Sequence, residues 1–310
     1  MPLLKSGSRQ MQVGDEDQIA LSDRLRTSAD VGRMPALIRH CSNPECRSGW
    51  IQLFRSRRRP VFEGGWSCSP DCTEALLKVA AHRELDGWVQ GAGLYQHRIP
   101  LGLLMLEQGW ITALQLRTAL EAQRKAGEFR IGEWLVRQGA TSEAMVCRAL
   151  SIQWGSPVLP LENGSGLIAS YELLPRLFVE AFGALPVKDP TGKFLYLGFE
   201  QCVDTALTFA AERMAGSRVE SGIVPSSAYS ESTRALRSGV FPEAQIAEAV
   251  SESAAAHLLA KSIERAQPIF SRLVRVHDWL WLRMHTKPDS TPVAMTARIR
   301  DVVCRVGILS

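Results

Sequence analysis

Long apolar runs are absent from this 310-residue chain, and no stretch reaches the roughly 18 to 20 apolar residues of a membrane-spanning helix. The first residues also lack the apolar core of a signal peptide, so we expect a cytoplasmic location. Charge is nearly balanced: the net charge of +4 gives no reason of its own to expect a nucleic-acid partner. With 45% hydrophobic and 22% charged residues, the composition fits an ordinary globular chain of two or three domains.

Motifs that carry catalysis are missing as well. The sequence contains no G-x-x-x-x-G-K-[ST] phosphate loop; the nearest stretch, DPTGK at 189–193, lacks the flanking glycines and is predicted to be a hairpin turn. The histidines are scattered without metal-ligand spacing, and no Ser/His/Asp or Cys/His arrangement stands out. We therefore expect no enzymatic activity.

Four of the seven cysteines form two close pairs about twenty residues apart, Cys41 and Cys46 in CSNPEC, and Cys68 and Cys72 in CSPDC. Such pairs suit a tetrahedral site with four thiolate ligands. The order of a knuckle, an extended middle and a last pair that opens a helix resembles a treble-clef zinc finger. We predict structural Zn²⁺ here, because four thiolates leave no open coordination position. Four unrelated cysteines, or two disulfides, are the alternatives.

Between the cysteine pairs lies a basic patch with arginines at positions 55, 57, 58 and 59. It is either a solvated loop or a contact for nucleic acid or for an acidic partner surface. The other three cysteines lie among apolar residues and are predicted to be core: Cys147, Cys202 and Cys304.

One block occurs twice at an offset of thirty residues, at 100–123 and at 130–153. Each copy is predicted to be helix, turn, helix. A glycine, Gly109 or Gly139, ends the first helix, and Thr112 or Ser142 is the expected N-cap of the second. Because an internal repeat sets the architecture, this pair of copies is the central feature of the chain.

Two details of the repeat are unusual for a plain helical core. A glycine inside each first helix costs about 1 kcal/mol relative to alanine, yet it permits close backbone approach. A glutamine, which offers both a donor and an acceptor, ends each apolar stripe. Two interpretations stay open at this point: a four-helix unit whose stripes are simply core, or a surface for a flat, charged ligand with polar edges.

The tandem pattern R-L-G-x-x-L-x-x-x-G, six residues, then L-x-x-x-L-x-x-Q resembles the MshEN domain, the N-terminal domain of type II secretion and MshE-type pilus ATPases. The first copy departs from it at the leading arginine, where this chain has Pro100. That copy matches the pattern at Leu101, Gly102, Met105, Gly109, Leu116, Leu120 and Gln123. The second copy matches at Arg130, Ile131, Gly132, Leu135, Gly139, Val146, Leu150 and Gln153.

The resemblance implies a ligand and a setting. Characterised members of the family bind cyclic di-GMP, a two-fold symmetric molecule, and each motif takes one half of it. The matching residues of both copies are therefore the predicted cyclic di-GMP site, with one arginine lost at Pro100. The family also implies a protein partner in a secretion, pilus or motility machine, and the resemblance covers residues 98–238.

Local patterns after the repeat predict mixed helices and strands. Up to residue 238 we expect a helix over 170–182 broken at Pro175, a hairpin over 184–199, a helix over 203–215, a strand over 218–224 and a helix over 226–236. Beyond that we expect an alanine-rich helix over 243–266, one strand over 271–285 and a further helix within 292–310.

The chain is thus predicted to be α+β: a small four-cysteine zinc finger, a helical tandem-repeat subdomain packed with a small α/β subdomain, and an α/β C-terminal tail. The expected boundaries are 1–35 for a flexible tail, 36–90 for the finger, 95–160 for the tandem-motif subdomain, 161–238 for the α/β subdomain and 241–310 for the extension. The leading functional prediction is a non-enzymatic cyclic di-GMP sensor or adaptor. The alternatives are an interaction module without a nucleotide ligand and, more weakly, a nucleic-acid-binding regulator.

Overall fold

The computed structural model describes residues 40–48, 59–86, 98–127, 129–161, 168–189, 191–286 and 295–307. It has the mixed α+β composition predicted from the sequence. The predicted tail over 1–35 and all of the arginine patch except Arg59 lie outside these residues. Within them, no helix combines the length and the apolar character that crossing a membrane requires.

The first described elements are a short hairpin and a helix: β1 (Val61–Phe62), β2 (Gly65–Trp66) and α2 (Pro70–Asp86). Glu63 and Gly64 both have left-handed backbone angles, φ 46° and 83°, as a two-residue type I′ turn requires. The Ser69 hydroxyl accepts a hydrogen bond from the backbone N–H of Cys72 at 3.2 Å and so caps the start of α2.

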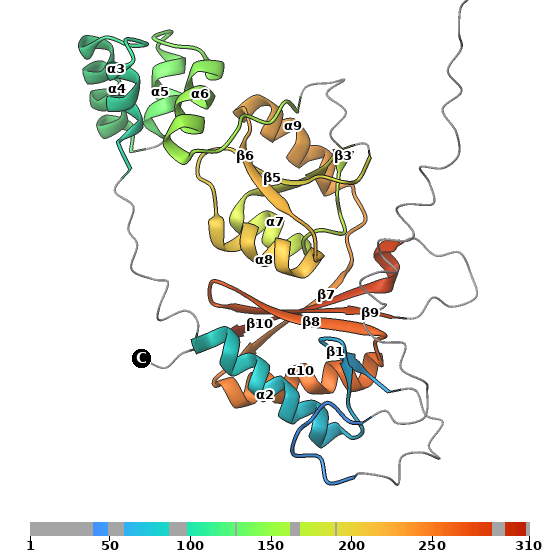
Figure 1. The fold of residues 1–310 in the computed structure, drawn as a ribbon. Helices are drawn as coiled ribbons and strands as arrows, with labels where there is room; N and C mark the ends of the chain where they lie inside the picture. Colours follow the sequence, from blue (N-terminus) through green and yellow to red (C-terminus); the bar gives the residue numbers. More distant parts are fainter. Residues whose placement is uncertain are drawn as a thin grey trace, which may run out of the picture. The chain divides into compact units, whose positions relative to one another are not determined.

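The repeat folds as predicted into two helix–turn–helix copies. The first copy is α3 (Leu101–Glu107) and α4 (Ala113–Ala126); the second is α5 (Ile131–Arg137) and α6 (Glu143–Trp154). Thr112 forms a reciprocal capping box with Gln115, and the Ser142 side chain accepts from the backbone N–H of Met145. All four helices gather in one bundle (Figure 1).

A four-stranded sheet and three helices follow the bundle. The strands are β3 (Ile168–Ala169), β4 (Ala184–Lys188), β5 (Leu195–Phe199) and β6 (Val219–Ile223), in that spatial order. The helices are α7 (Arg176–Phe182), α8 (Thr205–Ala215) and α9 (Ser226–Arg237). The predicted β4–β5 hairpin is confirmed, as are α8, β6 and α9.

The described residues of the C-terminal part form a second four-stranded sheet, one α-helix and one short 3-10 helix. The strand order is β7-β10-β9-β8, with β7 parallel to β10 and the other neighbours antiparallel. The elements are β7 (Glu243–Ala249), α10 (Glu252–Ala266), β8 (Phe270–Val276), β9 (Trp279–His285), the short 3-10 helix η3 (Met295–Arg298) and β10 (Ile299–Val306).

Three predictions for this C-terminal part were wrong. The expected helix over 243–266 is strand β7 followed by α10, because pairing with β10 overrides the helical propensity of an alanine- and glutamate-rich segment. The expected single strand over 271–285 is the β8–β9 hairpin, turning at His277, whose φ is 50°. The expected helix within 292–310 is mainly strand β10, paired on both sides.

A fourth prediction needs a smaller correction. The helix expected over 170–182 begins only at Arg176, with Pro175 as its N-cap residue. Since a proline disfavours helical backbone angles at the residue before it, the preceding segment stays non-helical.

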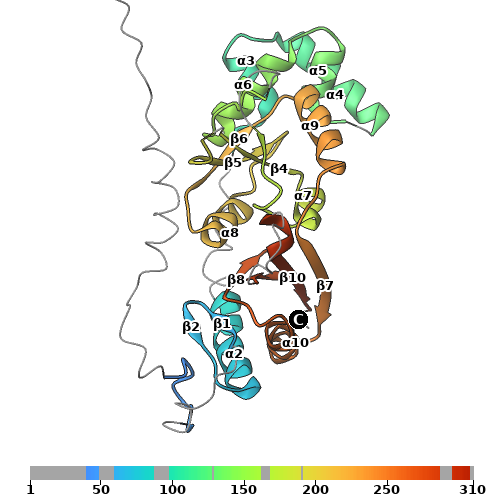
Figure 2. The same ribbon diagram turned by 90° about the vertical axis from the view of Figure 1, so that its right-hand side faces the viewer.

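The helix of the cysteine-rich segment packs against the C-terminal part of the chain. Leu77, Ala80 and Ala81 of α2 share one buried core with Leu259 and Ile263 of α10. Figures 1 and 2 show α2 and α10 side by side on one face of the second sheet. No local pattern predicted this pairing of distant segments, and the predicted domain boundaries remain a prediction.

The other face of the second sheet is also buried. The fully buried Trp281 of β9 packs edge-on against Phe178 of α7, with ring centroids 5.4 Å apart. Beside it, Arg283 forms a two-pronged ion pair with Asp301, 2.8 Å on each prong, and donates to the backbone carbonyl of Leu173. The sheet is therefore covered by α2 and α10 on one face and by α7 and α8 on the other.

His277, in the β8–β9 turn, links the second sheet to α8. Its Nε2 lies 2.7 Å from a carboxylate oxygen of Asp204, and its ring lies 5.0 Å from that of Phe182. Asp204 also caps α8 through the backbone N–H of Leu207 at 2.9 Å. The hydrogen bond with Asp204 raises the pKa of His277 despite its partial burial, and the nearby Asp278 acts in the same direction.

We expect this contact to make stability pH-dependent. A histidine with a raised pKa stabilises the folded state fully below its unfolded pKa of about 6.5, and this contribution is lost as the pH rises through the folded value. Chemical denaturation from about pH 6 to about pH 8 should therefore show falling stability in the wild type. Burial lowers the pKa of His285, so the influence of this residue on stability falls at more acidic pH than the range from about pH 6 to about pH 8. In His277→Gln this fall in stability with rising pH should vanish. If the fall is unchanged, it must come from the titration of another group.

Candidate functional site

The two copies of the repeat pack crosswise. The first helix of each copy contacts the second helix of the other: α3 contacts α6, and α5 contacts α4. This is the arrangement that a two-fold axis between the copies produces. The repeat in sequence is therefore also an approximate symmetry in space.

The glycine inside each first helix lies directly under a side chain of its partner helix. A Cβ at Gly102 would lie 2.6 Å from Cδ1 of Leu116, and one at Gly132 would lie 2.9 Å from Cγ1 of Val146. At Gly132 it would also lie 3.3 Å from the side chain of Leu101 in the first copy. Both glycines are thus needed for close helix packing, which accounts for their matched positions.

The two matched glutamines make matched hydrogen bonds. Gln123 donates from Nε2 to the backbone carbonyl of Phe129 at 3.0 Å, and Gln153 donates to that of Ile99 at 2.7 Å. Ile99 and Phe129 are themselves thirty residues apart. Each glutamine therefore fixes the backbone that leads into the first helix of the other copy. Because Ile99 and Phe129 precede the family pattern, the motif alone did not identify them.

The glycines that end the first helices adopt the left-handed conformation, with φ 71° at Gly109 and 67° at Gly139. The residues after them, Trp110 and Ala140, donate back to the carbonyls of Met105 and Leu135 at 2.9 Å in both copies. This is the Schellman arrangement at a helix C-terminus, and only glycine adopts its φ without strain.

The structure separates the predicted ligand residues by exposure. Those buried within the bundle are Gly102, Met105, Leu116, Gly132 and Leu135, and Leu150 is buried in the core that α6 shares with the first sheet. Those at least partly accessible are Leu101, Gly109, Leu120, Gln123, Arg130, Ile131, Gly139, Val146 and Gln153. Only the second group offers surface to a ligand, and the assignment of these residues to a ligand stays a prediction.

Arg130 and Pro100 occupy equivalent places, as the N-cap residues of α5 and α3. Arg130 is exposed and forms no ion pair within the described part of the chain. Arg98, two residues before Pro100, stacks over Trp154 with 3.4 Å between its guanidinium carbon and the ring centroid. Only the second copy therefore presents a guanidinium directly at a helix start.

The four paired cysteines converge in space. The Sγ atoms of Cys41, Cys46, Cys68 and Cys72 all lie within 4.8 Å of one another. Cys46 and Cys68 are 3.4 Å apart, and Cys68 and Cys72 are 3.5 Å apart. Four thiolates around a tetrahedral metal with bonds of about 2.3 Å are separated by about 3.8 Å. The cluster could therefore bind a metal ion.

Short polar contacts hold the two cysteine pairs together. Asn43 accepts the backbone N–H of Glu45 at 3.1 Å, which shapes the turn between Cys41 and Cys46. The same side chain donates to Sγ of Cys72 at 3.4 Å, and Ser42 N–H bonds to the Trp66 carbonyl at 2.9 Å. The turn is thus attached both to the β1–β2 hairpin and to the start of α2.

Other polar residues near the cluster have different roles. His40 is exposed and does not join the group of four thiols. Arg59 stacks over Trp66, with 4.2 Å between the guanidinium carbon and the ring centroid. Cys147 and Cys304 are buried as predicted, and burial raises the pKa of each thiol to about 11. Cys202 is exposed, so its prediction as a core residue was wrong.

Part of the chain is similar to type IV pilus assembly ATPases. Over 105 residues, 33% of the chain, it is 35% identical to the type IV pilus assembly ATPase PilB of Thermus thermophilus. Over 87 residues, 28% of the chain, it is 36% identical to PilB of Myxococcus xanthus. The matches cover only 11% and 15% of these curated relatives. The chain is therefore similar to one region of such ATPases, and no protein-family profile matches it.

A solved structure of MshE with cdg also matches. The identity is 26%, and the match covers 44% of this chain and 99% of the other. The TM-score is 0.35, which is too low to show a shared fold.

Proposed function

We propose that this protein is a non-enzymatic cytoplasmic sensor or adaptor that binds cyclic di-GMP through its tandem repeat, in the manner of the regulatory N-terminal region of type II secretion and type IV pilus ATPases. Its partner would be a component of such a machine. The similarity to PilB supports this setting.

One observation carries the ligand proposal: the crossed hydrogen bonds of Gln123 and Gln153, which give the two copies an approximate two-fold relation. A two-fold symmetric dinucleotide can present equivalent halves to equivalent surfaces. Partly exposed leucines supply apolar area for the purines, and Arg130 supplies a positive charge and a flat stacking face.

Calorimetric titration of the full chain with cyclic di-GMP tests the proposal. We expect saturable binding, and we expect Arg130→Ala to weaken it by about 1–3 kcal/mol, the scale of a lost charged hydrogen bond. Arg117→Ala is the matched control, because Arg117 is exposed on α4 and outside the family pattern. Absence of binding heat in the wild type would refute the proposal. Equal losses of affinity for cyclic di-GMP in the two variants would show that the ligand does not bind at Arg130.

Pro100 favours a second function, an interaction module that keeps the fold without the nucleotide. Proline supplies neither a charge nor a backbone N–H at a position where the second copy has Arg130. The bundle also exposes large apolar side chains, with Leu103 53% and Leu114 71% accessible. A folded protein that gives no heat with cyclic di-GMP would favour this module.

For the four cysteines we propose a structural zinc ion. An all-thiolate tetrahedral site is typical of zinc and has no open position for a substrate. The apolar residues that the hairpin and α2 bury pack into the core shared with α10 and the second sheet, and metal binding would add to the folding free energy of this segment.

A further inference from the structure

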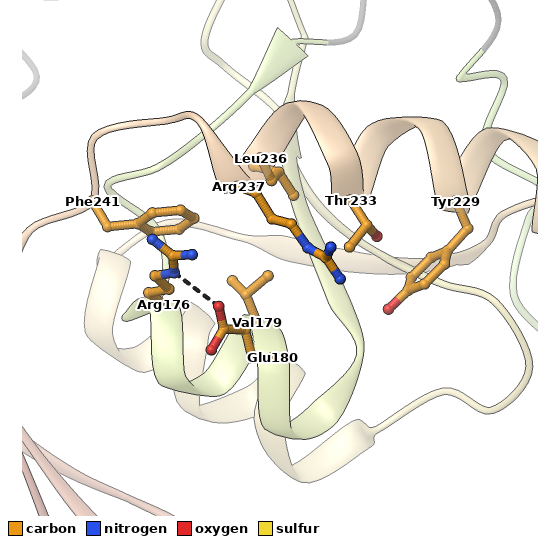
Figure 3. Close-up of a pocket in the computed structure, with 8 residues that line it drawn as sticks. All are labelled: Arg176, Val179, Glu180, Tyr229, Thr233, Leu236, Arg237 and Phe241. Atoms are coloured by element: carbon orange, nitrogen blue, oxygen red, sulfur yellow. Dashed lines mark hydrogen bonds and ion pairs between the residues drawn. The ribbon is translucent and has the colours of Figure 1, made fainter.

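We propose that a groove between α7 and α9 binds a small anionic ligand, in which a carboxylate or phosphate group is joined to a flat apolar body. A cavity of about 340 Å³ lies between these helices, and its principal polar and aromatic walls are Arg176, Tyr229, Thr233, Arg237 and Phe241 (Figure 3). A second cavity of about 310 Å³ adjoins it and shares Tyr229, Thr233 and Arg237.

Positive charge in the groove is incompletely balanced. Arg176 pairs with Glu180 at 2.8 Å, but neither Arg234 nor Arg237 forms an ion pair with any residue that the structure describes. In the second cavity, Glu200 accepts a hydrogen bond from the Ser226 hydroxyl at 2.5 Å. Three arginines therefore face two carboxylates. The unpaired guanidinium of Arg237 extends into the space between the helices (Figure 3), where it can bind an anionic group through two parallel hydrogen bonds.

The remaining walls suit an apolar body. Phe241 lies at one end of the groove and Tyr229 at the other (Figure 3), and the buried side chains of Val179 and Leu236 lie between them. The Thr233 hydroxyl is buried, and within the described ranges its polar interaction is with the Tyr229 hydroxyl alone. Both hydroxyls keep further hydrogen-bonding capacity that a ligand can use.

The Phe241 wall is held in place by packing. A Cβ at Gly239 would lie 1.9 Å from Cε1 of Tyr171, so the tyrosine ring lies directly on the backbone there. The same ring meets Phe241 edge-on, with centroids 5.2 Å apart. The connection from α9 to β7 is thereby fixed, and the groove keeps its shape without a ligand.

Size narrows the ligand class. Small-molecule sites range from roughly 300 to 1,000 Å³, so this cavity is at the lower limit. A single aromatic ring with one acidic group fits such a volume. None of the residues of the tandem repeat lines either cavity, so the groove is independent of the proposed cyclic di-GMP site.

Ligand-observed NMR titration of the full chain with benzoate, phenyl phosphate and benzamide tests the inference. We expect benzoate or phenyl phosphate to bind and the neutral benzamide not to bind; the tighter of the two anions identifies the preferred acidic group. In Arg237→Gln the dissociation constant should rise about tenfold, as for a lost charged hydrogen bond. Arg218→Gln should leave it unchanged, because Arg218 is 82% exposed and lies outside both cavities.

Circular dichroism checks that both variants remain folded, and binding of cyclic di-GMP should be the same in Arg237→Gln as in the wild type. Binding of benzamide as strong as that of benzoate would overturn the inference. So would an absence of binding by both anions, or equal effects of the two arginine substitutions.

Discussion

Replacing Cys72 with serine is expected to abolish stoichiometric metal binding and to destabilise the C-terminal half of the protein together with the cysteine-rich segment. Cys72 is buried in the first turn of α2, within 3.5 Å of Cys68. A serine hydroxyl is a poor ligand beside three thiolates, so the tetrahedral set would be broken. Structural zinc supplies folding free energy directly, so its loss should loosen the attachment of α2.

The effect should extend to α10 because of the residues next to Cys72. Thr73 hydrogen-bonds to the Ser67 hydroxyl at 2.7 Å and to a carboxylate oxygen of Glu264 on α10. Leu77 continues the contact in the shared core. A displaced start of α2 would therefore expose apolar surface on α10 as well.

Metal analysis and hydrogen exchange measure the two effects. We expect one metal ion per wild-type chain, close to none in Cys72→Ser, and faster exchange in both α2 and α10 of the variant. Cys202→Ser is the matched control, since Cys202 is exposed and outside the cluster. Full metal content in Cys72→Ser would show that the site is misassigned, and unchanged exchange in α10 would show that the two segments are not coupled.

Replacing Glu84 with glutamine is expected to lower the free energy of unfolding by about 2–3 kcal/mol, because it removes a buried charged acceptor from the donors that surround it. The Glu84 side chain is only 4% exposed. Its oxygens accept two hydrogen bonds from Arg213 at 2.7 Å and one from the backbone N–H of Arg275 at 3.2 Å. Arg83 donates a further hydrogen bond to a Glu84 carboxylate oxygen at 3.0 Å. One carboxylate thus joins α2, α8 and β8.

The pH dependence of stability gives a second readout. Burial alone would raise the pKa of Glu84, but the hydrogen bonds from Arg213 and Arg83 outweigh it and lower the pKa. A carboxylate with a lowered pKa stabilises the protein above its unfolded value of about 4.3, and this contribution is lost as the pH falls through the folded value. Acidification should therefore destabilise the wild type more than Glu84→Gln.

Glu220→Gln is the control for this experiment. Glu220 is 40% exposed and pairs with the largely exposed Arg218 at 3.1 Å, so its loss should cost less than about 1 kcal/mol. Denaturant unfolding of the three proteins compares the free energies. If Glu84→Gln and Glu220→Gln lower the free energy of unfolding by the same amount, the buried Glu84 carboxylate has no special role in joining α2, α8 and β8.

Local patterns predicted the repeat and the cysteine cluster well. Gly109 and Thr112 mark helix ends through their own backbone and side-chain chemistry, and such signals depend only on near neighbours. The paired cysteines of a knuckle and a helix start likewise depend on short spacings. The hydrogen bonds of Gln123 and Gln153 were not predicted, because they join separate copies.

The errors lie where distant pairing decides the local structure. In β7 the residues favour a helix, but β10 supplies a complete parallel partner more than fifty positions along the chain. The signal that was overlooked is Ser251, whose side chain caps α10 by accepting from Ala254 at 3.2 Å and marks the true start of the helix. At the β8–β9 turn, His277 adopts a left-handed φ; histidine is enriched in this conformation among residues other than glycine, but the conformation is uncommon for all of them and does not predict a turn.

The shared core of α2 and α10 also has a consequence for synthesis. The ribosome releases α2 long before α10 is made, so Leu77 and Ala81 lack their partners in α10 during the translation of everything between the two helices. Exposed apolar helices of this kind are prone to aggregate. A metal ion captured early by the four cysteines would keep α2 helical during that interval, ready to receive α10 when it emerges.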